Sequence, residues 1–356
     1  MMRRSSLAVL VAVLAFSCAS PRDPNDLSKM SATYKGEVGE SPVGVIPDAV
    51  LHDAQRNKDV TTTIEYPTKS AGNPLIVFSP GFGGSNDSYV GLSSYWASQG
   101  FVVVRVAHAD AGRKLAENQD FWQTQTETDR RNRVRDLMFV LDSLDQLEKS
   151  YPELQGKIDR TKIVVAGHSY GAYTALLAGG MKLFPGGTSY ADPRVKAIVA
   201  MSPQGIAANR GLTSDSWKDL RVPTMFMTGT RDFGANENEG PDWRRTAYEN
   251  AAAGDKFFVL IRGANHMTFT GVASGLGEQF DVNRSQPPMV DPRTGQEIYP
   301  STQQSTRGPA LVDRGTFASI RSISLMFWDS YLKDKKDAKE LLDPAKYAGS
   351  VEVSRK

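Results

Sequence analysis

Short apolar runs alternate along the chain with longer stretches in which apolar residues recur every three or four positions. The apolar runs predict strands that are buried on both faces, as in a parallel sheet. The longer stretches predict helices at 89–99, 129–147 and 316–333, with further helical segments around 170–179 and 242–253. Strands are predicted at 61–66, where we expect a sheet edge, and at 75–78, 101–106, 163–166, 197–201, 224–227 and 257–261. This alternation predicts an α/β fold with a mostly parallel, doubly wound sheet and flanking helices.

The body of the chain shows no internal repeat and no linker that would divide it. We therefore expect one domain over 45–342, preceded by a flexible polar tether at 19–44 and followed by a C-terminal tail at 343–356. The segment 270–309 is rich in Gly, Pro, Gln and Ser and has no clear periodicity. A loop of this length is uncommon inside a compact domain. It is interpreted as either a functional lid or a poorly ordered segment.

The first 18 residues have the pattern of a secretory signal peptide. Arg3 and Arg4 precede an apolar run at 7–16, which is too short to cross a bilayer but has the length of a signal-peptide core. Small residues then lead to Cys18, the only cysteine of the sequence, and permit cleavage just before it. The segment 14–18 resembles the lipobox of bacterial lipoproteins, which implies that Cys18 is acylated. We expect an exported protein, either a lipoprotein anchored in the cell envelope (periplasm or outer membrane) or, after ordinary signal-peptide cleavage, a freely secreted one.

Composition changes this picture mainly by excluding partners and cofactors. The chain has 356 residues, 40% of them hydrophobic, and a formal net charge of +2 at pH 7. No basic cluster is interleaved with aromatic residues, so we expect no nucleic-acid partner, and membrane contact only through the possible lipid anchor. The four histidines are scattered and there is no cysteine pair, so we expect no metal site and no disulfide.

The run 162–178 carries the clearest chemical signal. A buried strand and a helix-favouring stretch flank Gly167-His168-Ser169-Tyr170-Gly171, which matches the pattern G-x-S-x-G. In this pattern a strained turn between strand and helix presents the serine hydroxyl above the sheet, and a side chain at either glycine would crowd the turn. Ser169 is therefore predicted to be a nucleophile. The alternative is a serine that merely lies in a glycine-flanked turn.

A serine hydroxyl is a weak nucleophile at neutral pH, so it needs a histidine base and a carboxylate that orients the base. The G-x-S-x-G turn resembles the nucleophile elbow of the α/β-hydrolase superfamily, in which the order along the chain is serine, acid, histidine. Of the four histidines, only His266 follows Ser169, because His52, His108 and His168 all precede it. His266 also lies in a loop just after a predicted strand. It is the predicted general base, although a single loop histidine is often an ordinary surface residue.

The acid and the oxyanion donors are predicted at the ends of other strands. Asp232 follows the strand 224–227, at the carboxyl end where sites in parallel sheets gather, although Asp also favours turns for other reasons. Acyl transfer also needs hydrogen-bond donors for the developing oxyanion. The backbone N–H groups of Tyr170, next to the nucleophile, and of Phe82, in the glycine-rich turn 79–84, are the candidates. The turn has neither a GK[ST] ending nor a GxGxxG spacing, which argues against a phosphate-binding loop.

Walls of a substrate pocket are predicted from two polar segments and three aromatic residues. The segments 111–126 and 270–309 follow predicted strands and are expected to lie near the site. Phe121, Trp122 and Trp217 are candidate apolar wall residues. Each of them is also a natural core residue, because large aromatic side chains dominate hydrophobic cores.

Taken together, these motifs resemble the α/β-hydrolase superfamily from about residue 44 to residue 342. The segments 77–84, 96–103 and 167–171 resemble the platelet-activating-factor acetylhydrolase and predicted dienelactone hydrolase group, and are similar to bacterial cutinase-like polyesterases. The resemblance implies a serine esterase that hydrolyses carboxylic esters of short to medium acyl chain through an acyl-enzyme, without a cofactor. Its substrates would be small-molecule, lipid or polyester esters.

Two departures and two alternatives qualify this resemblance. True dienelactone hydrolases have Cys where this chain has Ser169, so lactone hydrolysis is not implied, and the paired cysteines of many cutinases are absent. A serine peptidase or amidase on the same fold is one alternative. The other is a catalytically inactive binding protein of the cell envelope. The catalytic residue types stand in the expected order, which a binding protein does not need.

Overall fold

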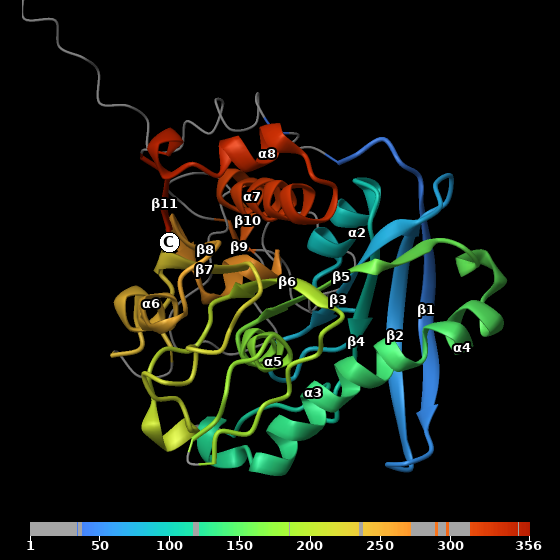
Figure 1. The fold of residues 1–356 in the computed structure, drawn as a ribbon, viewed down its shortest axis with the longest axis horizontal. Helices are drawn as coiled ribbons and strands as arrows, with labels where there is room; N and C mark the ends of the chain where they lie inside the picture. The colour runs from blue at the N-terminus through green and yellow to red at the C-terminus, as the bar shows by residue number, and fades with distance from the viewer. Residues whose placement is uncertain are drawn as a thin grey trace, which may run out of the picture.

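A nine-stranded, mostly parallel sheet forms the centre of the described part of the protein (Figure 1). The computed structural model describes residues 34, 38–116, 121–184, 186–234, 238–271, 289–290, 297–298, 314–347 and 349–356. The strand order is β1-β2-β4-β3-β5-β6-β7-β8-β11, in which β1, β2 and β11 run antiparallel to their neighbours and the rest are parallel. The strands are β1 (Val43–Asp53), β2 (Lys58–Pro67), β3 (Asn73–Ser79), β4 (Val102–Val106), β5 (Ile158–His168), β6 (Val195–Met201), β7 (Thr224–Arg231), β8 (Lys256–Asn265) and β11 (Val351–Arg355).

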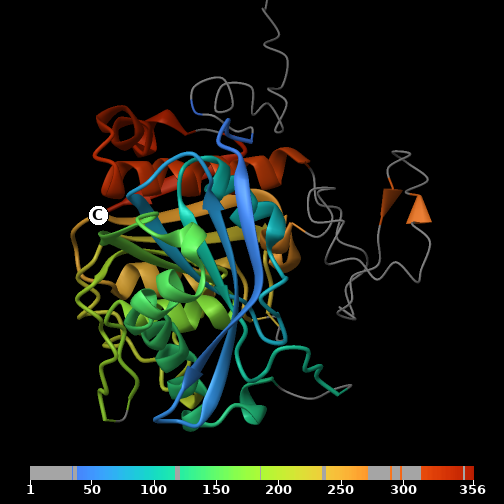
Figure 2. The same ribbon diagram turned by 90° about the vertical axis from the view of Figure 1, so that its right-hand side faces the viewer.

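Helices cover both faces of this sheet (Figures 1 and 2). α3, α5 and α6 pack on one face, whereas α2, α7 and α8 pack on the other. Alternate residues of β3 divide the core accordingly, because successive side chains of a strand point to opposite faces: Leu75 and Val77 join the first layer, Ile76 and Phe78 the second. The helices are α2 (Val90–Ser98), α3 (Glu127–Asp142), α4 (Leu144–Ser150), α5 (Tyr170–Ala178), α6 (Pro241–Asn250), α7 (Arg314–Leu332) and α8 (Lys336–Leu341).

Both edges of the sheet differ from the prediction. The segment 61–66 lies in β2, which is second from the edge, and β1 forms the edge itself. The expected tail 343–356 contains β11, which pairs antiparallel with β8. Val351 and Val353 of β11 are buried while Glu352 between them is exposed, which is the alternation of a half-buried strand. The tail prediction was therefore wrong for this segment, because its last strand is part of the sheet.

The predicted helix 129–147 is divided into α3 and α4. The division lies at Ser143, whose N–H bonds to the carbonyl of Val140 at 3.2 Å and so closes a tighter turn than an α-helix. α3 also begins two residues earlier than predicted. Thr126 and Asp129 form a reciprocal capping box at its N-terminus, which satisfies backbone donors of the first turn.

Several expectations fall mostly outside the described residues. The leader with Cys18 and most of the expected tether are among them. At one point of the tether, however, Tyr34 is buried, and its hydroxyl donates to Asp329 of α7 at 2.5 Å. In 270–309 the structure describes the first two residues and the paired strands β9 (Met289–Val290) and β10 (Glu297–Ile298). Within the described ranges, no helix combines the length and the apolar character that crossing a bilayer requires.

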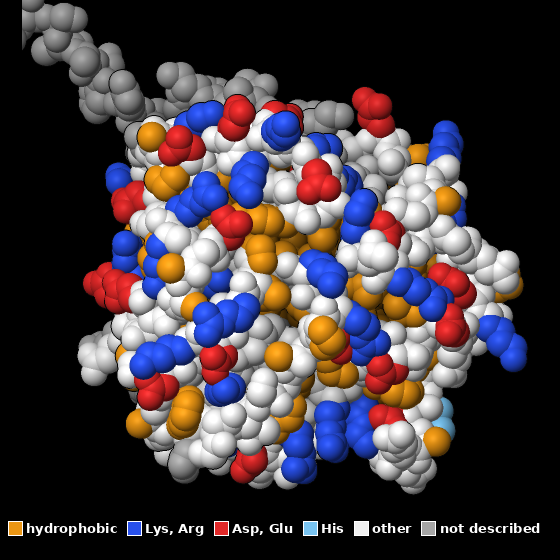
Figure 3. Space-filling model, in the orientation of Figure 1, with side chains coloured by type: hydrophobic (Ala, Val, Ile, Leu, Met, Phe, Trp, Pro, Cys, Tyr) orange, Lys and Arg blue, Asp and Glu red, His pale blue; other side chains and the backbone are white. Residues whose placement is uncertain are grey.

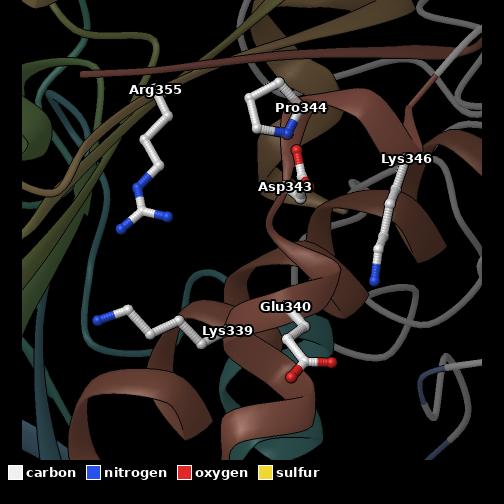
Figure 4. A pocket seen from close by; sticks show the side chains of 6 residues that line it. All are labelled: Lys339, Glu340, Asp343, Pro344, Lys346 and Arg355. Carbon is white, nitrogen blue, oxygen red and sulfur yellow. The ribbon is translucent and has the colours of Figure 1, made fainter.

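The surface carries charges of both signs. Lys and Arg side chains are interspersed with Asp and Glu across the face in Figure 3, in keeping with the net charge of +2. A shallow hollow of about 420 Å³ lies between α8 and β11 (Figure 4). Cationic and acidic side chains alternate around it, so it has no single sign of charge. Its lining residues, none of which is a predicted site residue, are Lys339, Glu340, Asp343, Pro344, Lys346 and Arg355.

Candidate active site

The turn between β5 and α5 holds Ser169 in a strained backbone conformation. Ser169 has φ 55° and ψ −117°, a region that residues with a side chain rarely adopt. Its N–H donates to the carbonyl of Met201 at 2.9 Å, which ties the turn to the end of β6. A Cβ at Gly167 would lie 2.2 Å from the Gly171 oxygen, and a Cβ at Gly171 would lie 1.8 Å from the Ser79 oxygen. Both glycines are therefore required for the close approach of helix and strand.

Two further strands bring the predicted base and acid to this serine. His266 directly follows β8, and its loop is fixed because the Asn265 side chain and Thr268 form a reciprocal capping box. The His266 Nε2 atom lies 2.9 Å from Ser169 Oγ. The Nδ1 atom lies 2.9 Å from Oδ1 of Asp232, which follows β7. The structure thus brings together the three residues predicted to be nucleophile, base and acid. We call them the elbow triad.

The acid of this triad is buried and surrounded by donors. The Asp232 side chain has no exposed surface, and its Oδ2 accepts a hydrogen bond from Thr228 Oγ1 at 2.8 Å. Arg244 Nη2 lies 3.1 Å from Asp232 Oδ1. Arg244 is itself held by the carbonyls of Ser202 and Pro203, at 3.0 and 2.9 Å from Nη1. Burial raises the pKa of Asp232, but the charge of Arg244 and the hydrogen bond with His266 outweigh it and keep the pKa below its ordinary value.

Arg244 was missed by the sequence analysis, and so was a second histidine beside the elbow triad. His168 is buried, with its Nδ1 atom 2.8 Å from the Tyr89 hydroxyl and its ring centroid 4.7 Å from that of His266. Burial lowers the pKa of His168 well below its ordinary value, so this imidazole is neutral. The Tyr89 oxygen also accepts the Gly81 N–H at 3.1 Å. Tyr89 therefore connects the nucleophile turn with the glycine-rich turn 79–84.

Four of the predicted donor and wall residues lie together, and one does not. Phe121 and Trp122 lie in a 3-10 turn and are half-buried. The Phe121 ring centroid is 4.9 Å from that of Phe82 and 5.0 Å from that of Tyr170, and the Trp122 centroid is 5.7 Å from that of Tyr170. Trp217, in contrast, is fully buried within the hydrophobic core. A side chain without exposed surface does not line an open pocket, so the wall prediction for Trp217 was wrong.

A second Ser-His-Asp chain lies deeper in the protein, and sequence reasoning did not find it. Ser79 Oγ is 2.9 Å from His108 Nε2, and His108 Nδ1 is 2.9 Å from Asp136 Oδ2. All three side chains are buried. Asp136 also accepts from Arg56 Nη1 and Lys58 Nζ, both at 2.7 Å. We call Ser79, His108 and Asp136 the buried triad.

The charges of the buried triad are strongly biased. Burial and the nearby Arg133 guanidinium lower the pKa of His108 to about 4, although Asp136 acts in the opposite direction. Burial raises the pKa of Asp136, but the hydrogen bond from His108 and the neighbouring cations lower it to about 2. The imidazole is therefore neutral and the carboxylate ionised at neutral pH. Among the described residues, neither this triad nor any other group of His, Cys, Asp and Glu forms a cluster that could hold a metal ion.

Comparisons with known proteins point to ester hydrolases. A family model described as PET hydrolase-like matches residues 59–283. Cutinase est1 of Thermobifida alba is 26% identical over 171 residues, which cover 48% of this chain and 46% of that protein. Bis(hydroxyethyl) terephthalate hydrolase of Streptomyces coelicolor is 26% identical over 173 residues, which cover 48% of this chain and 44% of that protein. The chain thus spans about half the length of the curated relatives it matches.

A solved structure agrees with the arrangement of the elements. The ferulic acid esterase from Streptomyces cinnamoneus superposes with a TM-score of 0.56 over 89% of this chain and 97% of that chain, at 19% sequence identity. At this identity the likeness shows the fold alone. The predicted α/β-hydrolase fold, with its mostly parallel sheet and flanking helices, is confirmed.

Proposed function

Because the chain belongs to the PET hydrolase-like family, we propose that it is a carboxylic ester hydrolase that works through an acyl-enzyme on Ser169. The observation that carries the proposal is the elbow triad, with both of its hydrogen-bond distances at 2.9 Å. An ionised carboxylate only accepts hydrogen bonds, so His266 carries its proton on Nδ1 and donates a hydrogen bond from there to Asp232. The Nε2 atom is then free to accept the Ser169 hydroxyl proton.

In the proposed reaction, Ser169 Oγ attacks the ester carbonyl carbon while its proton moves to His266 Nε2. The carbonyl oxygen becomes an oxyanion, and the backbone N–H groups of Phe82 and Tyr170 bind it. Each such donor contributes about 3–4 kcal/mol to the transition state in comparable sites. His266 then gives the proton to the departing alcohol, which leaves the acyl group on Ser169. Water then attacks the acyl carbon while His266 takes its proton, and His266 returns this proton to Ser169 Oγ as the acyl–oxygen bond breaks and the acid is released.

Asp232 and its neighbours hold the base during both proton transfers. When His266 becomes an imidazolium, the buried carboxylate of Asp232 stabilises the new positive charge. The Thr228 hydroxyl and the Arg244 guanidinium fix the position of that carboxylate and keep it ionised. Because these groups are already oriented when the reaction begins, no free energy is needed to reorient them during it. Such preorganisation is the main source of electrostatic catalysis.

The half-buried rings of Phe121 and Trp122 support an apolar acyl or aromatic site beside the oxyanion donors. We propose esters of short to medium acyl chain as substrates, and polyester fragments such as bis(hydroxyethyl) terephthalate, on which the Streptomyces coelicolor relative is named as acting. No cofactor is part of the proposed reaction. Export, with or without a lipid on Cys18, remains our proposal for its location, and it rests on the signal-peptide pattern of the first 18 residues.

The test is hydrolysis of a p-nitrophenyl ester series from acetyl to palmitoyl, followed by bis(hydroxyethyl) terephthalate. We expect activity on the short and medium esters, a decline with long chains, and no activity of Ser169→Ala above the uncatalysed rate. A fluorophosphonate that labels Ser169 alone would add direct support. Equal inactivity of the two proteins on every ester would contradict the proposal. Cleavage of peptide substrates, or tight ligand binding without turnover, would then favour the peptidase or the binding protein.

A further inference from the structure

A buried ion pair lies against the turn that carries the proposed oxyanion donor Phe82. Arg133 of α3 and Asp110, in the loop after β4, are joined through Nη1 and Oδ1 at 2.5 Å, with side chains 4% and 9% exposed. Arg133 Nη2 donates to the carbonyl of Pro80. On the other side of Phe82, the Gly83 N–H donates to Asp110 Oδ2 at 3.0 Å. One ion pair thus holds the backbone on both sides of the donor.

The Asp110 side of this contact is also fixed by the backbone. The Gly83 carbonyl accepts the Gly112 N–H at 2.9 Å, so the two loops are joined by hydrogen bonds in both directions. Gly83 has φ +74°, and a Cβ there would lie 2.4 Å from the Arg113 carbonyl oxygen. The turn can approach the loop this closely because it has no side chain at that point.

The same guanidinium also contacts the element that carries the second proposed donor. Its carbon atom lies 4.4 Å from the centroid of the Tyr170 ring. Arg133 Nε donates to Thr174 Oγ1 at 3.3 Å, and Thr174 Oγ1 donates to the Tyr170 carbonyl at 2.9 Å. Arg133 therefore connects the glycine-rich turn with the first turn of α5.

An oxyanion hole needs this kind of connection because its two donors come from separate elements. Catalysis depends on their separation and direction, and a displacement of about 1 Å costs roughly 100-fold in rate. A guanidinium is a rigid planar fork, so bonds to several partners fix the angles between them, which a lysine ammonium does not do. We propose that Arg133 and Asp110 are positioning residues that hold the Phe82 and Tyr170 N–H groups in fixed relation. This inference rests on the proposed function.

The test compares Arg133→Lys, Arg133→Met and Asp110→Asn with a matched control, Arg105→Lys. Arg105 is as buried as Arg133 and also pairs with a carboxylate, but its bonds go to Glu65 and to the carbonyl of Ser88. For a short p-nitrophenyl ester we expect kcat to fall about 10- to 100-fold in the Arg133 and Asp110 variants, with KM changed less than about threefold. The control should keep kcat within about threefold of wild type.

A second readout separates positioning of the donors from a general loss of structure. Sulfur is a weaker hydrogen-bond acceptor than oxygen, so a thionoester depends less on the oxyanion donors than the corresponding oxoester does. We expect the wild-type preference for the oxoester to shrink about tenfold in Arg133→Lys and Asp110→Asn, and to be unchanged in Arg105→Lys. A double variant Arg133→Lys/Asp110→Asn should lose little more than either single variant, because both act through one contact.

The outcomes are distinct. A kcat loss with a reduced oxoester preference in folded variants supports the inference. An unchanged preference, or a kcat loss no larger than in the control, overturns it while the proposed function stands. If Arg133→Met does not fold, Arg133→Lys and Asp110→Asn still decide between these results. A wild-type protein that hydrolyses neither ester overturns the proposed function, and this inference with it.

Discussion

The elbow triad and the buried triad have the same hydrogen-bond distances but very different surroundings. In both, the histidine Nε2 lies 2.9 Å from the serine Oγ and Nδ1 lies 2.9 Å from a carboxylate oxygen. The His266 side chain is 31% exposed, whereas that of His108 has no exposed surface. Ser169 has a positive φ at a strand-to-helix turn, and Ser79 is the last residue of β3. Hydrogen-bond connectivity alone therefore does not make a catalytic site.

The surroundings of the buried triad also oppose the proton transfer that catalysis requires. A catalytic imidazole must accept the serine proton, which requires that its charged form be stabilised. At His108, burial and the Arg133 guanidinium lower the pKa to about 4, so this ring resists protonation. A substrate also has no path to a serine without exposed surface. The comparison teaches that two triads of equal hydrogen-bond geometry differ in the exposure of the histidine and in what surrounds it, which is why we propose the elbow triad, and not the buried one, as the reactive site.

The largest expected difference is between the two serines. Ser169→Ala should lower kcat about 10⁶-fold, because it removes the nucleophile. Ser79→Ala should keep the activity per folded molecule within about tenfold but lower the free energy of unfolding by about 1–3 kcal/mol, since His108 Nε2 loses its partner. Ester hydrolysis and urea unfolding of both variants measure this. A Ser79→Ala protein as inactive as Ser169→Ala, at wild-type stability, would show that the assignment of the two triads is reversed.

The next difference is between the two acids. Asp232→Asn should lower kcat about 10⁴-fold, because an amide favours the wrong tautomer of His266, and should also lower the free energy of unfolding, because the buried Arg244 loses its carboxylate. Asp136→Asn should act on stability alone, costing about 3 kcal/mol, because Arg56 and Lys58 lose their common carboxylate. Kinetics of the folded fraction and chemical denaturation separate the two effects.

A matched control for the acids is Asp145→Asn on α4. Asp145 is 86% exposed and pairs with Arg160 at the surface, so its loss should cost less than about 0.5 kcal/mol. If Asp136→Asn is as stable as this control, the buried carboxylate contributes little to the fold. If Asp232→Asn retains most of the activity, His266 does not depend on Asp232 for its orientation.

Local signals made the elbow triad predictable. The glycines around Ser169 report a backbone conformation that few residues tolerate, and the order serine, acid, histidine left one candidate base. The apolar runs located the parallel strands, although β5 extends several residues beyond the predicted 163–166. The fold class followed from these runs. A strand that is buried on both faces forms a nearly continuous apolar run, so it can be recognised without knowing which strands it pairs with.

What the sequence did not reveal depends on contacts between distant segments. The buried triad joins Ser79, His108 and Asp136, which are separated by 29 and 28 residues and share no local pattern. Arg244 is one of several arginines, and only the tertiary structure places it against Asp232. β11 is short and half polar, so its pairing with β8 is decided by the open edge of the sheet and not by its own sequence.

The smallest expected difference is a pH dependence of stability that comes from His108. The pKa of this imidazole is about 4 in the folded protein and 6.5 without the fold, so as the pH falls the unfolded chain binds the proton first. Stability should therefore decrease as the pH falls from 6.5 to 4, by about 3 kcal/mol from this group. Asp136 acts in a lower window, because its pKa is lowered from 3.8 to about 2 and its contribution is lost only below 3.8.

His108→Asn removes the titrating ring but keeps an amide donor for Asp136. The variant should be less stable than wild type at pH 7 and should lose about 3 kcal/mol less between pH 6.5 and 4, as measured by urea denaturation at several pH values. His168, whose pKa is also lowered, keeps part of the slope in both proteins. Equal slopes in wild type and His108→Asn would mean that His108 can charge within the fold, and the buried triad would then lose its main chemical distinction from the elbow triad.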